Sequence, residues 1–146
     1  MKILFAASEA VPYCKTGGLA DVVGTLAQRL GALGHDVCLF LPKYRDVRAE
    51  PLAGGPARVV RVRFDGADVD VGLRFLHRRA VTTYFIDYPR FFDREGLYGA
   101  SGRDHEDNDR RFALYALAAL KARSPSASSP TSCTRTTGRP APSART

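Results

Sequence analysis

The sequence predicts an α/β fold with a parallel sheet, and two observations carry that prediction. Short apolar runs at 3–7 and 37–41 have the length and composition of strands buried on both faces. A segment with helical periodicity lies between them, so the first 41 residues predict a strand–helix–strand unit with a right-handed crossover. The chain has 146 residues, of which 45% are hydrophobic and 25% charged, which is typical of one ordinary globular domain.

The segment between these two strands predicts an amphipathic helix from about Leu19 to Leu33. Its large apolar residues recur at spacings of three and four, so we expect them to share one helical face that packs on the sheet. These residues are Leu19, Val22, Val23, Leu26, Leu30 and Leu33. Gly34 stands where a helix-terminating glycine belongs, and Pro42 closes the second strand.

A strand-rich stretch and a second helix are expected further along the chain. Alternating or β-branched patterns predict strands at 58–64, 68–71 and 81–86. Asp65-Gly66 is typical of a two-residue hairpin turn between the first two of these. An aromatic, glycine-containing loop at 88–102 leads to a helix at about 112–120, whose first turn is acidic and therefore complements the helix dipole.

The net charge of +7 is unevenly distributed. Residues 121–146 hold five of the 22 basic residues and none of the 15 acidic ones, so residues 1–120 carry a net charge of +2. From 124 onwards the composition is almost wholly Ser, Thr, Pro, Ala, Arg and Gly, which predicts a disordered tail. An electrostatic case for nucleic-acid binding would rest on this tail alone, and we expect no nucleic-acid partner.

The remaining composition excludes two further classes of protein. No apolar run reaches the roughly 18–20 residues that a membrane helix needs, so no membrane partner is expected. Cys14, Cys38 and Cys133 are odd in number and widely spaced, which argues against a disulfide framework and against a zinc site. We therefore expect no metal and a reducing, cytoplasmic location.

The loop Lys15-Thr16-Gly17-Gly18-Leu19 is the strongest candidate for chemistry. It follows the first strand, and ligands of open α/β sheets bind beyond the carboxyl ends of the strands. Two glycines leave backbone N–H groups open to a phosphate at a helix N-terminus, and Lys15 adds a mobile cation. Asp21, in the first helical turn, can accept hydrogen bonds from a sugar hydroxyl or cap the helix. The loop is neither a GxGxxG fingerprint nor a Walker A motif, which disfavours a dehydrogenase or an NTPase, and the residues alone leave an ordinary glycine-rich turn equally open.

A set of motifs over residues 1–121 resembles the start of bacterial glycogen synthases and plant starch synthases. The motifs are KILFAASEAVPY at 2–13, KTGGLADV at 15–22, GHDV at 34–37, LPKY at 41–44, FFDR at 91–94, GLYG at 96–99, and Asn108 with RFAL at 111–114. The resemblance implies a GT-B glycosyltransferase, in which two Rossmann-like domains face each other across a cleft. The chain would hold an incomplete N-terminal domain of this kind, over residues 1–121.

The resemblance also implies an activity and a set of substrate-binding residues. Such enzymes transfer glucose from ADP-glucose to the non-reducing end of an α-1,4-glucan, with retention and without a cofactor, in glycogen biosynthesis. By resemblance, Lys15 contacts the ADP-glucose phosphates, Gly18 lies against them, Asp21 is the acid of that loop on the ligand side, and Tyr98 borders the glucan acceptor. Further matches are Glu9 and His35, to which we assign structural roles, whereas the sequence identifies no partner for His77 or His105.

The resemblance ends before residue 130. Relatives continue with a segment reading roughly PDVLHAHDWQ, which carries an active-site histidine, whereas residues 130–139 read PTSCTRTTGR. Written in GC-rich codons and translated with the first base dropped, the family segment gives PTSCTRTTGR at every position. We infer a shift of reading frame between about Lys121 and Pro130, which makes 122–146 an out-of-frame, disordered tail.

Two interpretations of function follow. In the first, the chain is an N-terminal part of a glycogen synthase. The family's active-site histidine, its Arg/Lys pair on the phosphates and its acidic residue near the glucose would all lie further on, so we assign no catalytic residue here and expect no transfer activity from these 146 residues alone. In the second, the chain is a small non-enzymatic nucleotide- or RNA-binding module with a basic tail.

Overall fold

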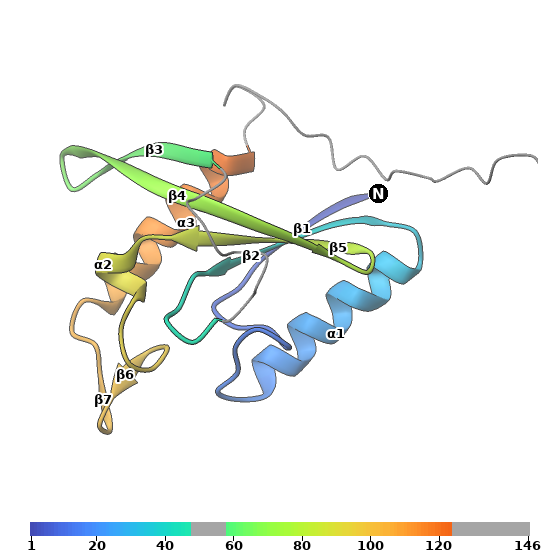
Figure 1. Cartoon of the computed structure of the whole chain (residues 1–146), viewed down its shortest axis with the longest axis horizontal. Coiled ribbons are helices and arrows are strands. Elements are labelled where there is room, and N and C mark those ends of the chain that lie inside the picture. The colour runs from blue at the N-terminus through green and yellow to red at the C-terminus, as the bar shows by residue number, and fades with distance from the viewer. Residues whose placement is uncertain (48–57, 124–146) are drawn as a thin grey trace, which may run out of the picture.

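The computed structural model describes residues 1–47 and 58–123. The elements, in chain order, are β1 (Lys2–Ala6), α1 (Gly18–Ala32), β2 (Asp36–Pro42), β3 (Arg58–Phe64), β4 (Ala67–Arg78), β5 (Val81–Asp87), α2 (Pro89–Phe92), β6 (Gly99–Ala100), β7 (Arg103–Asp104) and α3 (Asn108–Arg123). The expected strand–helix–strand start is confirmed, as are the later strands and the last helix. Figure 1 shows α1 lying apart from α3, with the strands of the sheet running between the two ends of the molecule.

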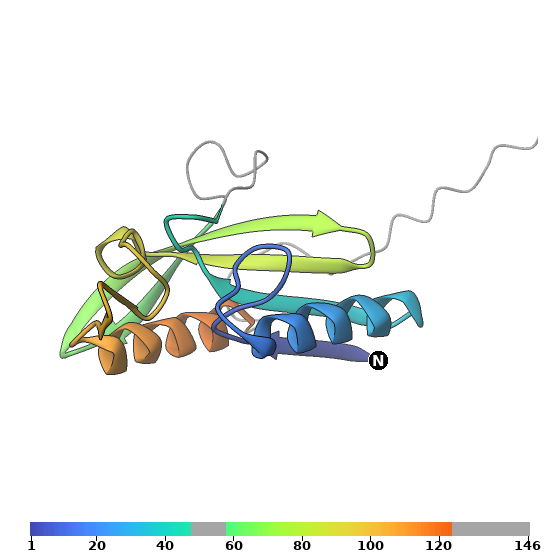
Figure 2. The same cartoon turned by 90° about the horizontal axis from the view of Figure 1, so that it is seen from below.

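Five of the strands form one mixed sheet in the order β1-β2-β5-β4-β3. β1, β2 and β5 are parallel, whereas β4 pairs antiparallel with both β5 and β3. Among the described residues β1 therefore lies at one edge of the sheet, as Figure 2 also shows. The carboxyl ends of the three parallel strands share one edge, and the loop that follows β1 begins there.

The core is formed by β2 and β5, by the buried residues of β3 and β4, and by α1 and α3, which pack on the sheet. β2 is buried along nearly its whole length, as its continuous apolar run predicts. The hydroxyl of Tyr115, from α3, lies 2.9 Å from the carbonyl oxygens of both Ala7 and Phe40 and shares its one proton between these two acceptors. This contact ties α3 to the ends of β1 and β2 and fixes the edge at which the candidate site lies.

The prediction for the buried face of the first helix is wrong. Leu19, Val22, Leu26 and Leu33 are 44–75% exposed, and of the predicted set Val23 is buried and Leu30 half-buried. The face that packs is instead made of small residues, which are Ala20, Val23, Gly24, Ala27 and Gly31.

The reason for this correction is the close approach of α1 to its neighbours. A Cβ atom on Gly24 would lie 2.4 Å from the Val11 carbonyl oxygen, and one on Gly31 would lie 2.7 Å from that of Ala80. Large side chains do not fit in that space, so the helix turns its leucines outward. The small residues also recur with helical spacing, and a hydrophobicity pattern alone does not separate the two adjacent faces.

The remaining elements refine the expected boundaries. Asp65 and Gly66 have φ values of +50° and +75° and join β3 to β4, as the hairpin motif predicts. β4 is longer than expected, and the aromatic loop contains the short helix α2 and the β6–β7 hairpin. α3 ends at Arg123, two residues beyond the expected limit at Lys121. The rest of the predicted tail, residues 124–146, lies outside the described residues.

Candidate functional site

The loop between β1 and α1 presents an open helix N-terminus. Gly17 is the N-cap of α1 and has an extended backbone, and no side chain makes a capping hydrogen bond there. A Cβ atom added to Gly17 or Gly18 would meet nothing within 4 Å. The start of α1 therefore has no side-chain cap and nothing packed where a Cβ of either glycine would lie, and the positive end of the helix dipole at this position suits an anionic group.

Lys15 and Asp21 meet across this opening. The ammonium of Lys15 lies 2.6 Å from a carboxylate oxygen of Asp21, and both side chains are about half exposed, at 52% and 53%. An ion pair with that exposure contributes little to stability, so a ligand can separate it at low cost. The structure thus brings together Lys15, Gly18 and Asp21, three of the four residues singled out from the sequence.

A buried acid, Glu9, stabilises the conformation of this loop through hydrogen bonds. Glu9 is 3% exposed, and one of its carboxylate oxygens accepts hydrogen bonds from the backbone N–H and the hydroxyl of Thr16, at 2.5 and 2.8 Å. These bonds fix the residue that follows Lys15, which supports the structural role expected for Glu9. His35 is the other family match that was expected to have a structural role. Its Nδ1 atom lies 3.4 Å from the N-terminal nitrogen of Met1.

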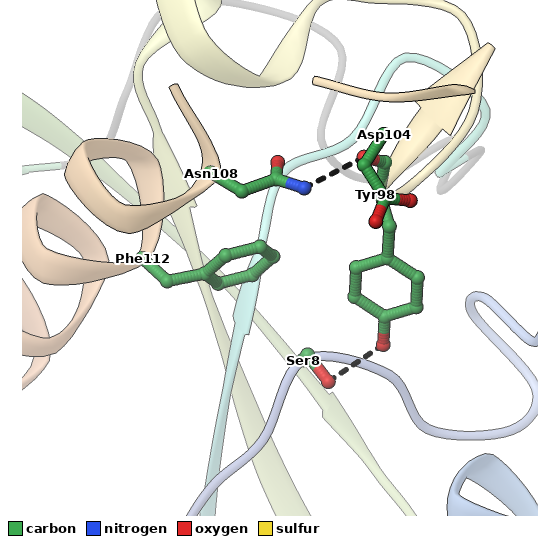
Figure 3. Close-up of a pocket in the computed structure, with 5 residues that line it drawn as sticks. All are labelled: Ser8, Tyr98, Asp104, Asn108 and Phe112. Atoms are coloured by element: carbon green, nitrogen blue, oxygen red, sulfur yellow. Dashed lines mark hydrogen bonds between the residues drawn. The ribbon is translucent and has the colours of Figure 1, made fainter. Parts of the chain in front are cut away.

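The fourth predicted residue, Tyr98, lies against the same loop from another part of the chain. Its hydroxyl donates a 2.7 Å hydrogen bond to the Oγ atom of Ser8, and its ring packs against Phe112 with centroids 5.9 Å apart. Ser8 and Tyr98, with Asp104, Asn108 and Phe112, line an open pocket of about 520 Å³ (Figure 3). The pocket offers aromatic rings, a hydroxyl, an amide and a carboxylate, which are groups that bind sugars.

Sequence reasoning missed the other members of this pocket. Ser8 and Phe112 belong to family motifs but were given no role in the site, and Asp104, which lies in β7, belongs to no motif. Asn108 also belongs to a family motif, but no sequence pattern places it beside Tyr98. The pocket forms because the β6–β7 segment folds back onto the loop after β1 (Figure 3).

Burial shapes the protonation of the groups around the site. Burial raises the pKa of the Tyr98 phenol, while hydrogen bonding to Ser8 lowers it. Burial also raises the pKa of the Cys14 thiol to about 11, so the cysteine beside Lys15 is protonated at neutral pH and is not a reactive thiolate. The guanidinium of Arg111 is completely buried, and that burial lowers its pKa.

The other titratable candidates have local partners. Nδ1 of His77 lies 3.0 Å from the Thr82 hydroxyl, and Nε2 of His105 lies 3.2 Å from the Glu95 carbonyl oxygen. Within residues 1–47 and 58–123 no group of three or more His, Cys, Asp or Glu side chains is arranged to hold a metal ion. In the same part of the chain, no helix is long and apolar enough to cross a membrane.

Comparison with known proteins decides the family. A family model described as the starch synthase catalytic domain matches residues 2–130. This chain belongs to that family. The match favours the glucosyltransferase interpretation over a small nucleotide- or RNA-binding module.

Individual relatives agree with this assignment. A glycogen synthase of Koribacter versatilis is 45% identical over 129 residues, covering 83% of this chain and 25% of the relative. A glycogen synthase of Syntrophotalea carbinolica is 42% identical over 126 residues, covering 84% of this chain and 25% of the relative. The chain thus spans about a quarter of the length of the curated relatives that it matches.

A solved structure shows the same fold. It is the catalytic domain of starch synthase IV from Arabidopsis thaliana, bound to ADP and acarbose. The TM-score is 0.70 at 31% sequence identity, and the match covers 82% of this chain and 24% of that one. The fold is therefore an α/β arrangement like that of the GT-B starch synthase catalytic domain.

Proposed function

We propose that this chain is the N-terminal part of a glycogen synthase, which transfers glucose from ADP-glucose to the non-reducing end of an α-1,4-glucan in the cytoplasm, and that it contributes to the sites of both substrates. The observation that supports this most directly is the open N-terminus of α1. There, no side chain caps the helix, the space beside Gly17 and Gly18 is free, and Lys15 pairs with Asp21 of the first helical turn. ADP-glucose carries a diphosphate, the anion that such an arrangement suits.

Each group in the loop has a role in this proposal. The Lys15 ammonium leaves Asp21 and pairs with the diphosphate, while Gly18 lets the phosphate oxygens approach the helix. The Asp21 carboxylate, released from Lys15, accepts hydrogen bonds from a sugar hydroxyl. Glu9 keeps the loop in place through Thr16.

The second part of the proposal assigns the pocket beside Tyr98 to the glucan. Glucose rings pack on aromatic faces and hydrogen-bond through their hydroxyls, and the pocket wall supplies both kinds of contact. The Arabidopsis structure is described as bound to ADP and acarbose, which supports sites for a nucleotide and for a sugar-like ligand on this fold. We propose no catalytic residue here. Stabilising a leaving diphosphate needs several cations placed against it, whereas this loop supplies one, Lys15.

The test is a comparison of ADP-glucose binding to the full chain and to Lys15→Ala, measured by saturation-transfer NMR at moderate salt. Affinity should be millimolar or weaker, because one charge-assisted contact contributes about 1.5–3 kcal/mol before the cost of association. We expect Lys15→Ala to weaken binding roughly three- to tenfold, which is about 0.7–1.4 kcal/mol.

Two control variants make this comparison specific. Lys2→Ala removes an exposed lysine at the opposite end of β1, and should leave binding unchanged. The triple variant Arg135→Ala, Arg139→Ala, Arg145→Ala removes basic residues that attract any diphosphate. Equal affinity of Lys15→Ala and Lys2→Ala, or loss of binding only in the triple variant, would show that the loop is not the site.

A further inference from the structure

We propose that Asn108, braced by the buried Arg111, is the positioning residue for Tyr98. The role of Tyr98 as part of the wall of the glucan pocket rests on the proposed function. The geometry that holds Tyr98 is independent of any ligand. Asn108 also lines the pocket. Within the described residues, however, the side chains of Asn108 and Arg111 make no hydrogen bond to Lys15 or Asp21, so their influence on that loop passes through Tyr98.

The side-chain amide of Asn108 bridges two groups. Its Nδ2 atom donates a 2.8 Å hydrogen bond to the carbonyl oxygen of Tyr98, and its Oδ1 atom accepts a 2.7 Å hydrogen bond from Nη1 of Arg111 (Figure 3 shows the first). Neither partner can exchange roles, because a carbonyl only accepts and a guanidinium only donates. The orientation of the amide is therefore fixed, and it links Tyr98 to Arg111.

Arg111 is suited to serve as the anchor of this link. It is 0% exposed, and its guanidinium lies beside the rings of Phe92 and Phe112, at 5.2 and 5.6 Å from their centroids. Nε donates to the Phe91 carbonyl oxygen at 2.7 Å, and Nη1 donates to that of Leu97 at 3.1 Å as well as to Asn108. The guanidinium thus gathers acceptors from α2, from the segment before Tyr98 and from the start of α3.

The cost of this arrangement indicates that it serves more than stability. The ion pairs within the described residues do not include Arg111, and its Nη2 atom is buried there without a hydrogen-bond partner. A buried charge without a partner carboxylate carries a large desolvation penalty, which its hydrogen bonds to backbone carbonyl oxygens offset only in part. What Arg111 supplies, and an apolar residue would not, is a rigid set of donors that holds Leu97 and Asn108 on either side of Tyr98.

Tyr98 is consequently fixed at both ends. Its carbonyl oxygen accepts from Asn108 and also from the backbone N–H of His105, at 2.9 Å. Its hydroxyl reaches Ser8, at the start of the loop that leads to Lys15. Asn108 therefore determines where the Tyr98 ring stands relative to the nucleotide-sugar loop.

The substitution Asn108→Asp separates positioning from a purely structural role. The aspartate keeps an acceptor for Arg111, places a negative charge beside a buried cation, and suits the first turn of α3. It loses the donor to Tyr98, and its oxygen repels the Tyr98 carbonyl oxygen. We therefore expect a melting temperature that is unchanged or higher, together with a displaced Tyr98.

The measurement is NMR of the full chain labelled at the tyrosine Cζ carbon, over a pH titration. Tyr98→Phe identifies the Tyr98 signal among the six tyrosines, and Ser8→Ala shows the effect of freeing the hydroxyl end. In Asn108→Asp we expect the Tyr98 signal to move toward that of free tyrosine and to titrate at lower pH than in the parent chain. The signals of the buried Tyr44 and Tyr115 should stay in place.

Each alternative outcome overturns the proposal. An unmoved Tyr98 signal in Asn108→Asp would show that Asn108 does not position the ring. Movement of all tyrosine signals together would show a general role in folding, and a parent chain whose Tyr98 already resembles free tyrosine would show that the ring is not held. No sugar or nucleotide enters this experiment, so its result is independent of the ADP-glucose titration.

Discussion

The loop after β1 has two functional regions, one at each end. Lys15 lies near its end and Tyr98 packs against Ser8 at its start, and the two regions are held in contrasting ways. Lys15 and Asp21 form a half-exposed ion pair in front of an open helix N-terminus. Tyr98 is fixed through Asn108 to a completely buried guanidinium and through its hydroxyl to Ser8. A charged ligand can rearrange the first region cheaply, whereas the second offers a preformed surface.

This difference matches the chemistry of the two proposed ligands. A diphosphate binds mainly through charge, and it can draw a mobile lysine away from a weak intramolecular partner. A glucan binds through flat apolar contact and many weak hydrogen bonds, for which a preorganised surface reduces the entropy lost on binding. The substitutions below test whether the two regions really differ in rigidity.

The largest expected effect comes from removing the buried anchor. Arg111→Met leaves the carbonyl oxygens of Phe91 and Leu97 without their donor, and each unsatisfied buried acceptor costs about 1–3 kcal/mol. The relief of a buried charge offsets part of this, so we expect a loss of about 2–4 kcal/mol in the free energy of unfolding. Urea denaturation followed by circular dichroism measures it.

The matched change in the open region is Lys15→Ala, which should alter the free energy of unfolding by less than about 0.5 kcal/mol. Similar losses for Lys15→Ala and Arg111→Met would contradict the contrast between the two regions. A stable Arg111→Met chain with an undisturbed Tyr98 would contradict the role of Arg111 as an anchor.

An effect smaller than that of Arg111→Met, but larger than that of Lys15→Ala, is expected from one of two glycines in α1. In Gly24→Ala the new Cβ would collide with the backbone of Val11, so we expect a loss of about 1–3 kcal/mol in the free energy of unfolding. Gly18→Ala places its Cβ in free space and should change that free energy by less than about 0.5 kcal/mol. The same urea experiment compares the two, and equal losses would show that α1 is not pressed against the loop.

The sequence predicts β2 well because a strand buried on both faces must be a continuous apolar run. The apolar run at 3–7 also forms a strand, but the prediction that it is buried on both faces is wrong, because β1 lies at the edge of the sheet and none of its residues is fully buried. The sequence also predicts the turn at Asp65-Gly66, because few other residue pairs accept two positive φ values in succession. The buried face of α1 was predicted wrongly because its packing depends on how closely Val11 and Ala80 approach. That distance is a tertiary property, which helical periodicity does not contain.

The candidate site divides in the same way. Lys15, Gly18 and Asp21 lie within seven residues of one another, so local pattern and resemblance suffice to group them. Asn108 and Arg111 depend on contacts with a loop about ten or more residues away, and an arginine in a helix with several charged residues gives no sign of complete burial. The burial of Arg111 could have been suspected only from the phenylalanines of the two motifs, which are Phe91, Phe92 and Phe112.

The central claim, that the open start of α1 binds the diphosphate of a nucleotide sugar, is tested most directly by mapping ADP-glucose onto the backbone amides of the full chain by NMR. We predict shifts that saturate in the millimolar range and are largest for the amides of residues 16–19, that ADP reproduces, and that glucose does not. Amides of 16–19 that stay unmoved while signals elsewhere shift would contradict the account.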